Sequence, residues 1–245
     1  MYIGRMLKSV CLQTPFFVVR KMALLFVVLC FCSCVEKDVS RGNDALRIGD
    51  YERSTVNFSK ALDEEPANRD ARYGLALSYY ALAEERERLR VRALDLWEKA
   101  VNEFRILSKV DSSGKIDAAY STSLFYLARA MLAEQGRANV LPLLDHSIML
   151  DSLNYFSLNL KALLLERQGE FEKSKKIYAY IVTKEPKFSS AYVNLGNLYW
   201  KLGDIESAWD IWSMGHVAIP DDATLLRWTE IAEDSLKALV EKGEL

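Results

Sequence analysis

The stretch AYVNLGNLYWKLGDIESAWDIWSMGHVAIPDD, residues 191–222, decides the fold. Its apolar residues recur at helical spacing, Gly203 and Asp204 interrupt the pattern, and Pro220 begins the next connection. Two short helices of this kind cannot bury their apolar faces alone. The stretch therefore predicts a helix, a tight turn and a second helix, which must stack against neighbouring units.

The same features recur upstream with a period of 34 residues. Four pairs show this spacing: Gly169 and Gly203, Pro186 and Pro220, Tyr178 and Trp212, Ala162 and Gly196. Small residues stand where backbones are expected to approach closely, namely Gly196, Ala208 and Gly215. Large residues are expected to fill the space between helices, namely Tyr192, Leu195, Tyr199 and Trp212.

This pattern resembles the tetratricopeptide repeat. The family pattern W-x2-L-G-x2-Y, then A-x3-F, then P is met by Tyr192, Leu195-Gly196, Tyr199, Ala208, Trp212 and Pro220. Carried along the chain, the resemblance predicts units at about 35–68, 69–107, 121–154, 155–188 and 189–222. It implies an all-α fold, a right-handed superhelical stack of about five helix pairs.

Two segments depart from the period, and the last segment closes the stack. The charged AEERERLRVRA, residues 83–93, predicts a lengthened, solvated helix rather than a nucleic-acid contact. Residues 108–120 predict a loop insertion, either a contact loop or a tolerated insertion. Residues 223–245 predict an amphipathic capping helix after the repeat domain of 35–222.

All four cysteines lie at or before residue 34, so the remaining chain can form neither a disulfide nor a thiolate metal site. A metal cluster at the N-terminus is disfavoured because the two histidines, His146 and His216, are far along the chain. Arg20 and Lys21 precede an apolar run of eleven residues at 22–32, in the order of a secretory signal. A bilayer-spanning helix needs about 20 apolar residues.

The run Phe31-Cys32-Ser33-Cys34 resembles a bacterial lipoprotein signal, with Phe31 where leucine is usual. The resemblance implies a signal segment at 1–34, lipidation of Cys34 by acyl chains such as palmitate, and a lipid-anchored protein of the bacterial cell envelope with its domain in the periplasm. A short uncleaved anchor or a mispredicted start are the alternatives, because Met1, Met6 and Met22 are all possible starts.

Charge and motifs exclude other function classes. Removal of residues 1–34 would take away four basic residues and no acid, leaving 28 basic against 34 acidic residues. Nucleic acid is therefore not an expected partner. Phosphate-binding loops and nucleophile motifs are absent, and Asp145 and His146 point in different directions on a helix. We expect no enzyme, no cofactor and no metal.

The resemblance implies that the first helix of each pair lines a concave face that binds a protein or peptide. Aromatic and arginine side chains are the usual interface anchors, which favours Tyr80, Phe125, Arg129 and Trp200. A frame error of one residue would turn several candidates into core residues. The full predicted set is Tyr73, Tyr80, Phe125, Arg129, Asn159, Arg167, Asn197, Trp200 and Lys201.

Two functions fit this reading. The first is a membrane-tethered adaptor that holds other envelope proteins. The second is an accessory subunit of a solute transporter that binds a small ligand. An adaptor needs an open, continuous groove, whereas a solute site is expected to be a closed, concave pocket.

Overall fold

The computed structural model describes residues 34–136 and 138–242, and every regular element in these ranges is a helix. A helix over residues 34–47 comes first. It is followed by α2 (Tyr51–Glu64), α3 (Arg69–Arg88), α4 (Leu94–Leu107), α5 (Asp117–Gln135), α6 (Leu141–Leu150), α7 (Tyr155–Arg167), α8 (Phe171–Lys184), α9 (Ser189–Lys201), α10 (Ile205–Ala218) and α11 (Ala223–Lys242). The predicted all-α fold is confirmed.

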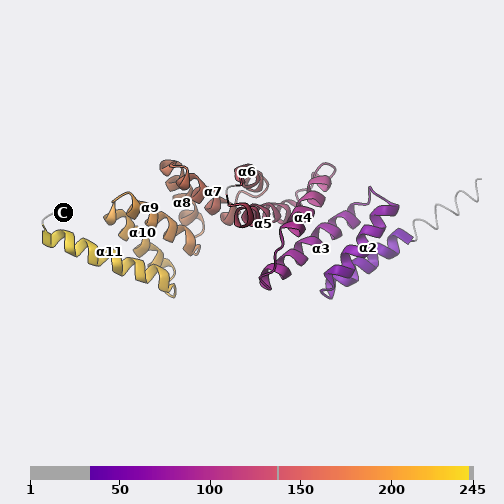
Figure 1. Cartoon of the computed structure of the whole chain (residues 1–245), viewed down its shortest axis with the longest axis horizontal. Helices are drawn as coiled ribbons and strands as arrows, with labels where there is room; N and C mark the ends of the chain where they lie inside the picture. The colour runs from indigo at the N-terminus through magenta and orange to yellow at the C-terminus, as the bar shows by residue number, and fades with distance from the viewer. Residues whose placement is uncertain (1–33, 137, 243–245) are drawn as a thin grey trace, which may run out of the picture.

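The helices form an elongated stack. From α2 onward, each helix packs against the next one in the chain, and α7 and α9 also contact each other, as do α9 and α11. Figure 1 shows the helices following one another along the long axis, from indigo at one end to yellow at the other. Contacts therefore join near neighbours in sequence, which is the arrangement of a solenoid.

Polar caps and turn glycines fix where these helices begin and end. The side chains of Asp50, Asn68, Asn154 and Asp204 each accept a hydrogen bond from the backbone N–H three residues later. Such caps satisfy an N–H group that has no partner inside the helix. Gly203 has a φ of 83°, a conformation that favours glycine, and it ends the turn between α9 and α10.

Helices approach closely where a glycine faces a large ring. A Cβ on Gly196 of α9 would lie 2.2 Å from Nε1 of Trp212 of α10. A Cβ on Gly74 of α3 would lie 2.2 Å from Cζ of Phe58 of α2. Both rings are fully buried. Gly196 is thus small for the reason that the sequence indicated, since a larger residue would collide with the ring.

Two segments depart from the period, as the sequence indicated. Helix α3 continues for 20 residues, through Arg88, into the charged segment. The loop predicted at 108–120 is shorter than expected, because α5 begins at Asp117 and includes its last four residues. Ile116 and Tyr120 are 3% and 1% exposed, so their burial holds this end of α5 against the core. The unit expected from residue 121 therefore starts earlier.

The first and last predicted segments lie partly outside the described residues. Of the signal segment predicted at 1–34, only Cys34 is described. The capping helix predicted at 223–245 is described as α11, up to Lys242. Within residues 34–136 and 138–242, no helix combines the length and apolar character needed to cross a membrane.

Candidate partner-binding face

The nine predicted contact residues all lie on the first helices of the pairs, namely α3, α5, α7 and α9. We call their surface the first-helix face. Tyr73, Arg129, Arg167 and Lys201 are exposed, and Tyr80, Phe125, Asn159, Asn197 and Trp200 are half-buried. All nine therefore retain area that a partner could contact.

An aromatic run adjoins the middle of this face. It is formed by Tyr80, Tyr126, Phe125 and Phe156 of first helices, by Trp97, a fully buried residue of α4, and by Phe188, which precedes α9. Trp97 and Tyr126 stack with ring centroids 4.6 Å apart, and Tyr80 meets Trp97 edge-on at 5.3 Å. The run continues from Tyr126 to Phe125 at 5.2 Å. Such offset and edge contacts hold the rings in fixed positions.

Phe156 extends the aromatic run to the next helix pair. Its ring centroid lies 5.7 Å from Phe125 of α5 and 5.3 Å from Phe188, which precedes α9. Phe156 is 60% exposed although it is a large apolar side chain. The run therefore joins α3 to the start of α9 and presents one ring largely to solvent.

Arg129 places a positive charge over the run. Its guanidinium lies 4.6 Å from the ring centroid of Tyr126 and 5.8 Å from that of Phe125. Arg129 also forms an ion pair with Glu87 of α3, and Oε1 of Glu87 accepts a hydrogen bond of 2.8 Å from Nε1 of Trp97. The charged pair thus ties α3, α4 and α5 together beside the rings.

The structure brings three predicted residues, Tyr80, Phe125 and Arg129, around Tyr126. The hydroxyl of Tyr80 donates to Oε1 of Glu84 at 3.0 Å, and burial followed by this carboxylate raises the pKa of Tyr80. Tyr73 lies apart and meets Phe104 edge-on at 6.4 Å.

The predicted residues of α7 and α9 form separate contacts. Nδ2 of Asn194 donates to Oδ1 of Asn159 at 3.0 Å, and Nζ of Lys201 donates to Oε1 of Glu166 at 3.1 Å. Trp200 lies 5.9 Å from the buried Trp212 and packs against the core, so part of its ring has a structural role.

Sequence reasoning missed Phe156 and Phe188. Phe156 stands three residues before Asn159, so both lie on the same side of α7. An aromatic residue at that spacing from a predicted contact residue was the available signal. Phe188 lies in the connection before α9, where the helical frame assigns no face.

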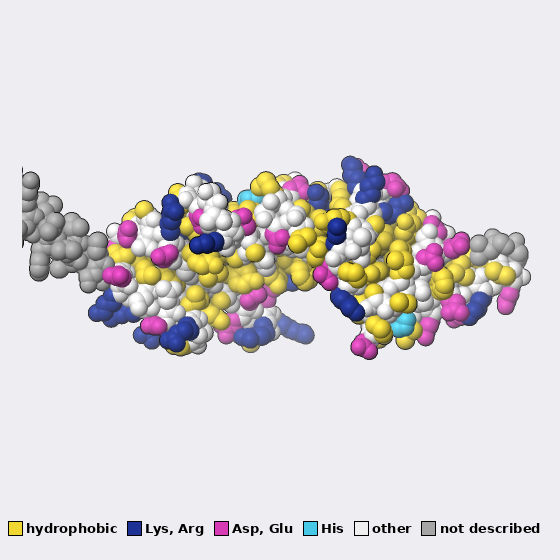
Figure 2. All heavy atoms as spheres, turned by 180° about the vertical axis from the view of Figure 1, so that it is seen from behind, with side chains coloured by type: hydrophobic (Ala, Val, Ile, Leu, Met, Phe, Trp, Pro, Cys, Tyr) yellow, Lys and Arg dark blue, Asp and Glu magenta, His cyan; other side chains and the backbone are white. Residues whose placement is uncertain are grey.

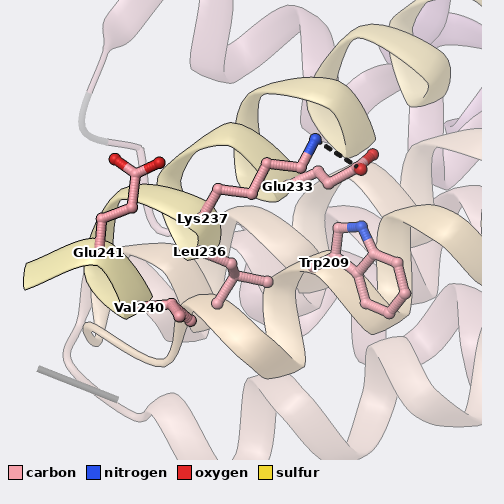
Figure 3. A pocket seen from close by; sticks show the side chains of 6 residues that line it. All are labelled: Trp209, Glu233, Leu236, Lys237, Val240 and Glu241. Carbon is pink, nitrogen blue, oxygen red and sulfur yellow. Dashed lines mark ion pairs between the residues drawn. The ribbon is translucent and has the colours of Figure 1, made fainter. Parts of the chain in front are cut away.

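Hollows at the surface of the described residues include the following three. One of about 590 Å³ includes Arg90, Arg92 and Glu134. One of about 410 Å³ lies between α10 and α11, where Figure 3 shows Trp209 beside Leu236 and Val240 and the ion pair of Glu233 and Lys237 at the rim. The third, about 390 Å³, includes Phe156 and Phe188 and therefore adjoins the aromatic run.

Figure 2 shows hydrophobic side chains at the surface along much of one face, with charged side chains between them. Among the described residues, no group of three or more histidine, cysteine or acidic side chains could hold a metal ion. Oδ1 of Asp145 lies 2.6 Å from Nζ of Lys161, whereas His146 meets the ring of Tyr120 edge-on at 5.2 Å. These adjacent residues thus serve different neighbours.

Two stretches of the chain match a known repeat family. The family model described as tetratricopeptide repeat matches residues 39–84 and 159–212. Human tetratricopeptide repeat protein 6 is 27% identical over 203 residues, which is 81% of this chain. The chain covers 35% of that protein's length, about a third.

Solved structures show the same fold at low identity. YrrB, described as a tetratricopeptide-repeat protein with an unusual peptide-binding site, has a TM-score of 0.57 at 18% identity, covering 82% of this chain and 97% of its own. MamA has a TM-score of 0.55 at 16% identity, covering 78% and 94%. The C-terminal part of a repeat protein from Cytophaga hutchinsonii has 0.58 at 14%, covering 82% and 72%. The chain thus shares the helical solenoid fold of these repeat proteins, and residues 39–84 and 159–212 match the tetratricopeptide-repeat model.

Proposed function

We propose that this protein is an adaptor that binds a protein or peptide segment on its first-helix face and is held at a bacterial envelope membrane by a lipid on Cys34. The tetratricopeptide-repeat fold is a scaffold suited to protein interaction, because stacked helix pairs present an extended surface. The partner is a folded protein or a segment of one, with no part for nucleic acid.

The exposed ring of Phe156 within the aromatic run carries this proposal. A ring that is 60% exposed is costly to leave in water, and burial against a partner would recover that cost. The rings around it are held by mutual contacts, and Arg129 lies over them. Preorganised aromatic and arginine side chains are the usual energetic centres of protein interfaces.

YrrB shows that a scaffold of this shape can carry a peptide-binding site. YrrB is described as having a peptide-binding site. The identity of 18% supports the shared scaffold and not shared contact residues. For this chain, the choice of a peptide or protein therefore rests on the aromatic run.

The surroundings of Cys34 suit a lipid anchor. Cys34 is exposed with a free thiol, whereas the next residue, Val35, is 5% exposed and packs in a cluster with Phe58. Acyl chains on Cys34 could leave the surface without disturbing that cluster. Stable attachment would need two or three chains, since one gives only marginal binding. Mass spectrometry of the N-terminal peptide from native membranes tests this; an unmodified peptide would refute it.

The hollows favour an adaptor over a solute accessory. All three lie at the surface between helices or connections, and none is an enclosed cavity. A site that retains a small solute usually buries most of the ligand's surface. The described surface is better suited to a chain lying across it.

Cross-linking in native membranes tests the binding site. We expect a Phe156→Ala, Arg129→Glu variant to lose a defined cross-linked partner, with apparent affinity falling by roughly tenfold or more. Met214→Ala on α10 is the matched control, since Met214 is 56% exposed on a second helix. Circular dichroism should show all variants folded. Equal capture by both variants would exclude the first-helix face.

A further inference from the structure

The hollow of about 390 Å³ beside the aromatic run has a distinct composition. We call it the loop hollow, because it lies where α5 meets the α6–α7 and α8–α9 connections. The lining residues that matter here are Asp151, Leu153, Tyr155, Phe156, Glu185 and Phe188. Aromatic and acidic side chains thus share one small space, and no basic side chain lines it.

Three rings form its apolar wall. Phe156 and Phe188 meet edge-on with centroids 5.3 Å apart, and Tyr155 lies 6.4 Å from Phe188. Leu153 is 57% exposed at its edge. Rings at these angles offer their faces and edges to a side chain that enters between them.

Two carboxylates supply the charge. Asp151 and Glu185 are both half-buried, and within the described ranges neither forms an ion pair. Lys187, two residues after Glu185, donates instead to the carbonyl oxygen of Ala218. Desolvation raises the pKa of Tyr155, and Tyr180, Glu185 and Asp151 add to this in that order.

The geometry points to the loop hollow as a subsite for one lysine or arginine side chain of the bound segment. A cation over aromatic faces is attracted by the ring electrons, and carboxylates at the edge add charge complementarity. The inference rests on the proposed function and specifies it. Phe156 belongs to both the aromatic run and the loop hollow, so a single extended segment can contact both.

Capped peptides test the subsite directly. The probes are Ac-Gly-Gly-X-Gly-Gly-amide with X as arginine, citrulline or glutamate, titrated by NMR into the full-length protein in detergent. Citrulline keeps the shape of arginine without its charge. We expect the arginine peptide to bind about fivefold more tightly than the citrulline peptide, and the glutamate peptide to bind least. Equal binding of arginine and citrulline would overturn the inference.

Matched variants locate the effect. Asp151→Asn, Glu185→Gln should abolish the preference for arginine over citrulline, while the amide oxygen at 151 still accepts from the N–H of Leu153, a bond of 2.9 Å in the native protein. Asp63→Asn, Glu64→Gln makes the same change of net charge on exposed residues of α2. This control should keep the preference. If it also loses the preference, overall charge explains the binding and the subsite is refuted.

The two proposals can fail separately. If membrane cross-linking depends on Phe156 and Arg129 but the native protein shows no preference for arginine, the adaptor stands and the subsite falls. If the carboxylate variant loses a real preference but no partner is cross-linked, the subsite stands and the adaptor falls.

Discussion

The C-terminal stack, α7 to α11, and the middle segment, α4 to α6, are built differently. One continuous core cluster runs through the C-terminal stack, from Leu158 to Ala232. The buried residues of the middle segment fall in three smaller clusters. The family model matches 159–212 but passes over residues 85–158. Regular repeats thus give a continuous core, whereas the irregular region is assembled from separate contacts.

The aromatic run lies mainly in and beside the irregular middle segment, whereas the C-terminal stack is the regular scaffold. The middle segment and its borders hold most of the aromatic run and one wall of the loop hollow. In a solenoid, stability is approximately a sum over units and their interfaces. A regular C-terminal stack can therefore remain rigid while the irregular region departs from the family pattern.

Removal of a buried tryptophan should have the largest effect and test whether the two regions are independent. Trp212 is fully buried and stacks on Trp228 at 5.2 Å, and Trp97 is fully buried in the middle segment. We expect Trp212→Ala and Trp97→Ala each to cost about 3–5 kcal/mol in free energy of unfolding. Hydrogen exchange should show lost protection in α9–α11 for Trp212→Ala and in α3–α5 for Trp97→Ala. If either variant lost protection along the whole chain, the stack would unfold as one cooperative unit and the two regions would not be independent.

A second test concerns the close contact inside the C-terminal stack. Gly196→Ala would place Cβ 2.2 Å from Nε1 of Trp212, and we expect a loss of about 1–3 kcal/mol in a urea titration. The unit before it has Ala162 at the equivalent position, with Tyr178 in place of the tryptophan. Gly196→Ala, Trp212→Tyr should therefore be less destabilised than the sum of the single variants. Strict additivity would show that the clash is relieved elsewhere.

The capping contact of Asp222 should have an intermediate effect with a defined pH dependence. Its Oδ2 accepts from Ser189 of α9, and its Oδ1 accepts from the N–H groups of Thr224 and Leu225 of α11. We expect Asp222→Ala to cost about 1 kcal/mol. The hydrogen bond from Ser189, followed by those from the backbone, holds the pKa of Asp222 below its ordinary value.

The sign of the pH effect follows from the lowered pKa. The ionised carboxylate contributes stability above the unfolded pKa of about 3.9, and this contribution is lost as pH falls through the lower folded pKa. The native protein should therefore lose more stability than Asp222→Asn in this acid range, as measured by urea unfolding at successive pH values. A parallel loss in both proteins would contradict the role of this carboxylate.

The smallest expected change in stability comes from two surface ion pairs, one at the middle segment and one in the C-terminal stack, which should differ in their effect on partner binding. Arg129 pairs with Glu87 across α3 and α5, and Lys201 pairs with Glu166 across α7 and α9. Both cations are half-exposed, so Arg129→Gln and Lys201→Gln should each cost less than about 1 kcal/mol. Only Arg129→Gln should weaken partner cross-linking, because only Arg129 lies over the aromatic run. Equal weakening by Lys201→Gln would extend the site into the C-terminal stack.

The fold was predictable where local chemistry repeats. Gly203, Pro220 and the pair of Gly196 and Trp212 occur at the family spacing, and they specify the turn, the exit and the close approach. The start of α5 was not predictable from local chemistry. Aspartate, serine and glycine indicated a loop, whereas the burial of Ile116 and Tyr120, a tertiary effect, begins the helix at Asp117.

The candidate site was predictable in part. The helical frame located Tyr80, Phe125 and Arg129 on one face, and the structure places them around Tyr126. The helical frame did not indicate Phe188, because Phe188 lies in a connection and its position depends on how successive helix pairs pack. The contact role of all nine predicted residues stays a prediction that the variants above can test.

The burial of Val35 has a mechanical consequence under the proposed lipidation. Cys34 and Val35 belong to one helix, so no flexible spacer would separate the acyl chains from the folded stack. Lipoproteins with a disordered leader can sweep a large volume above the bilayer. In this protein the lipidated end would instead be held directly at the bilayer by the first helix. Its partners would therefore have to bind close to the lipid headgroups.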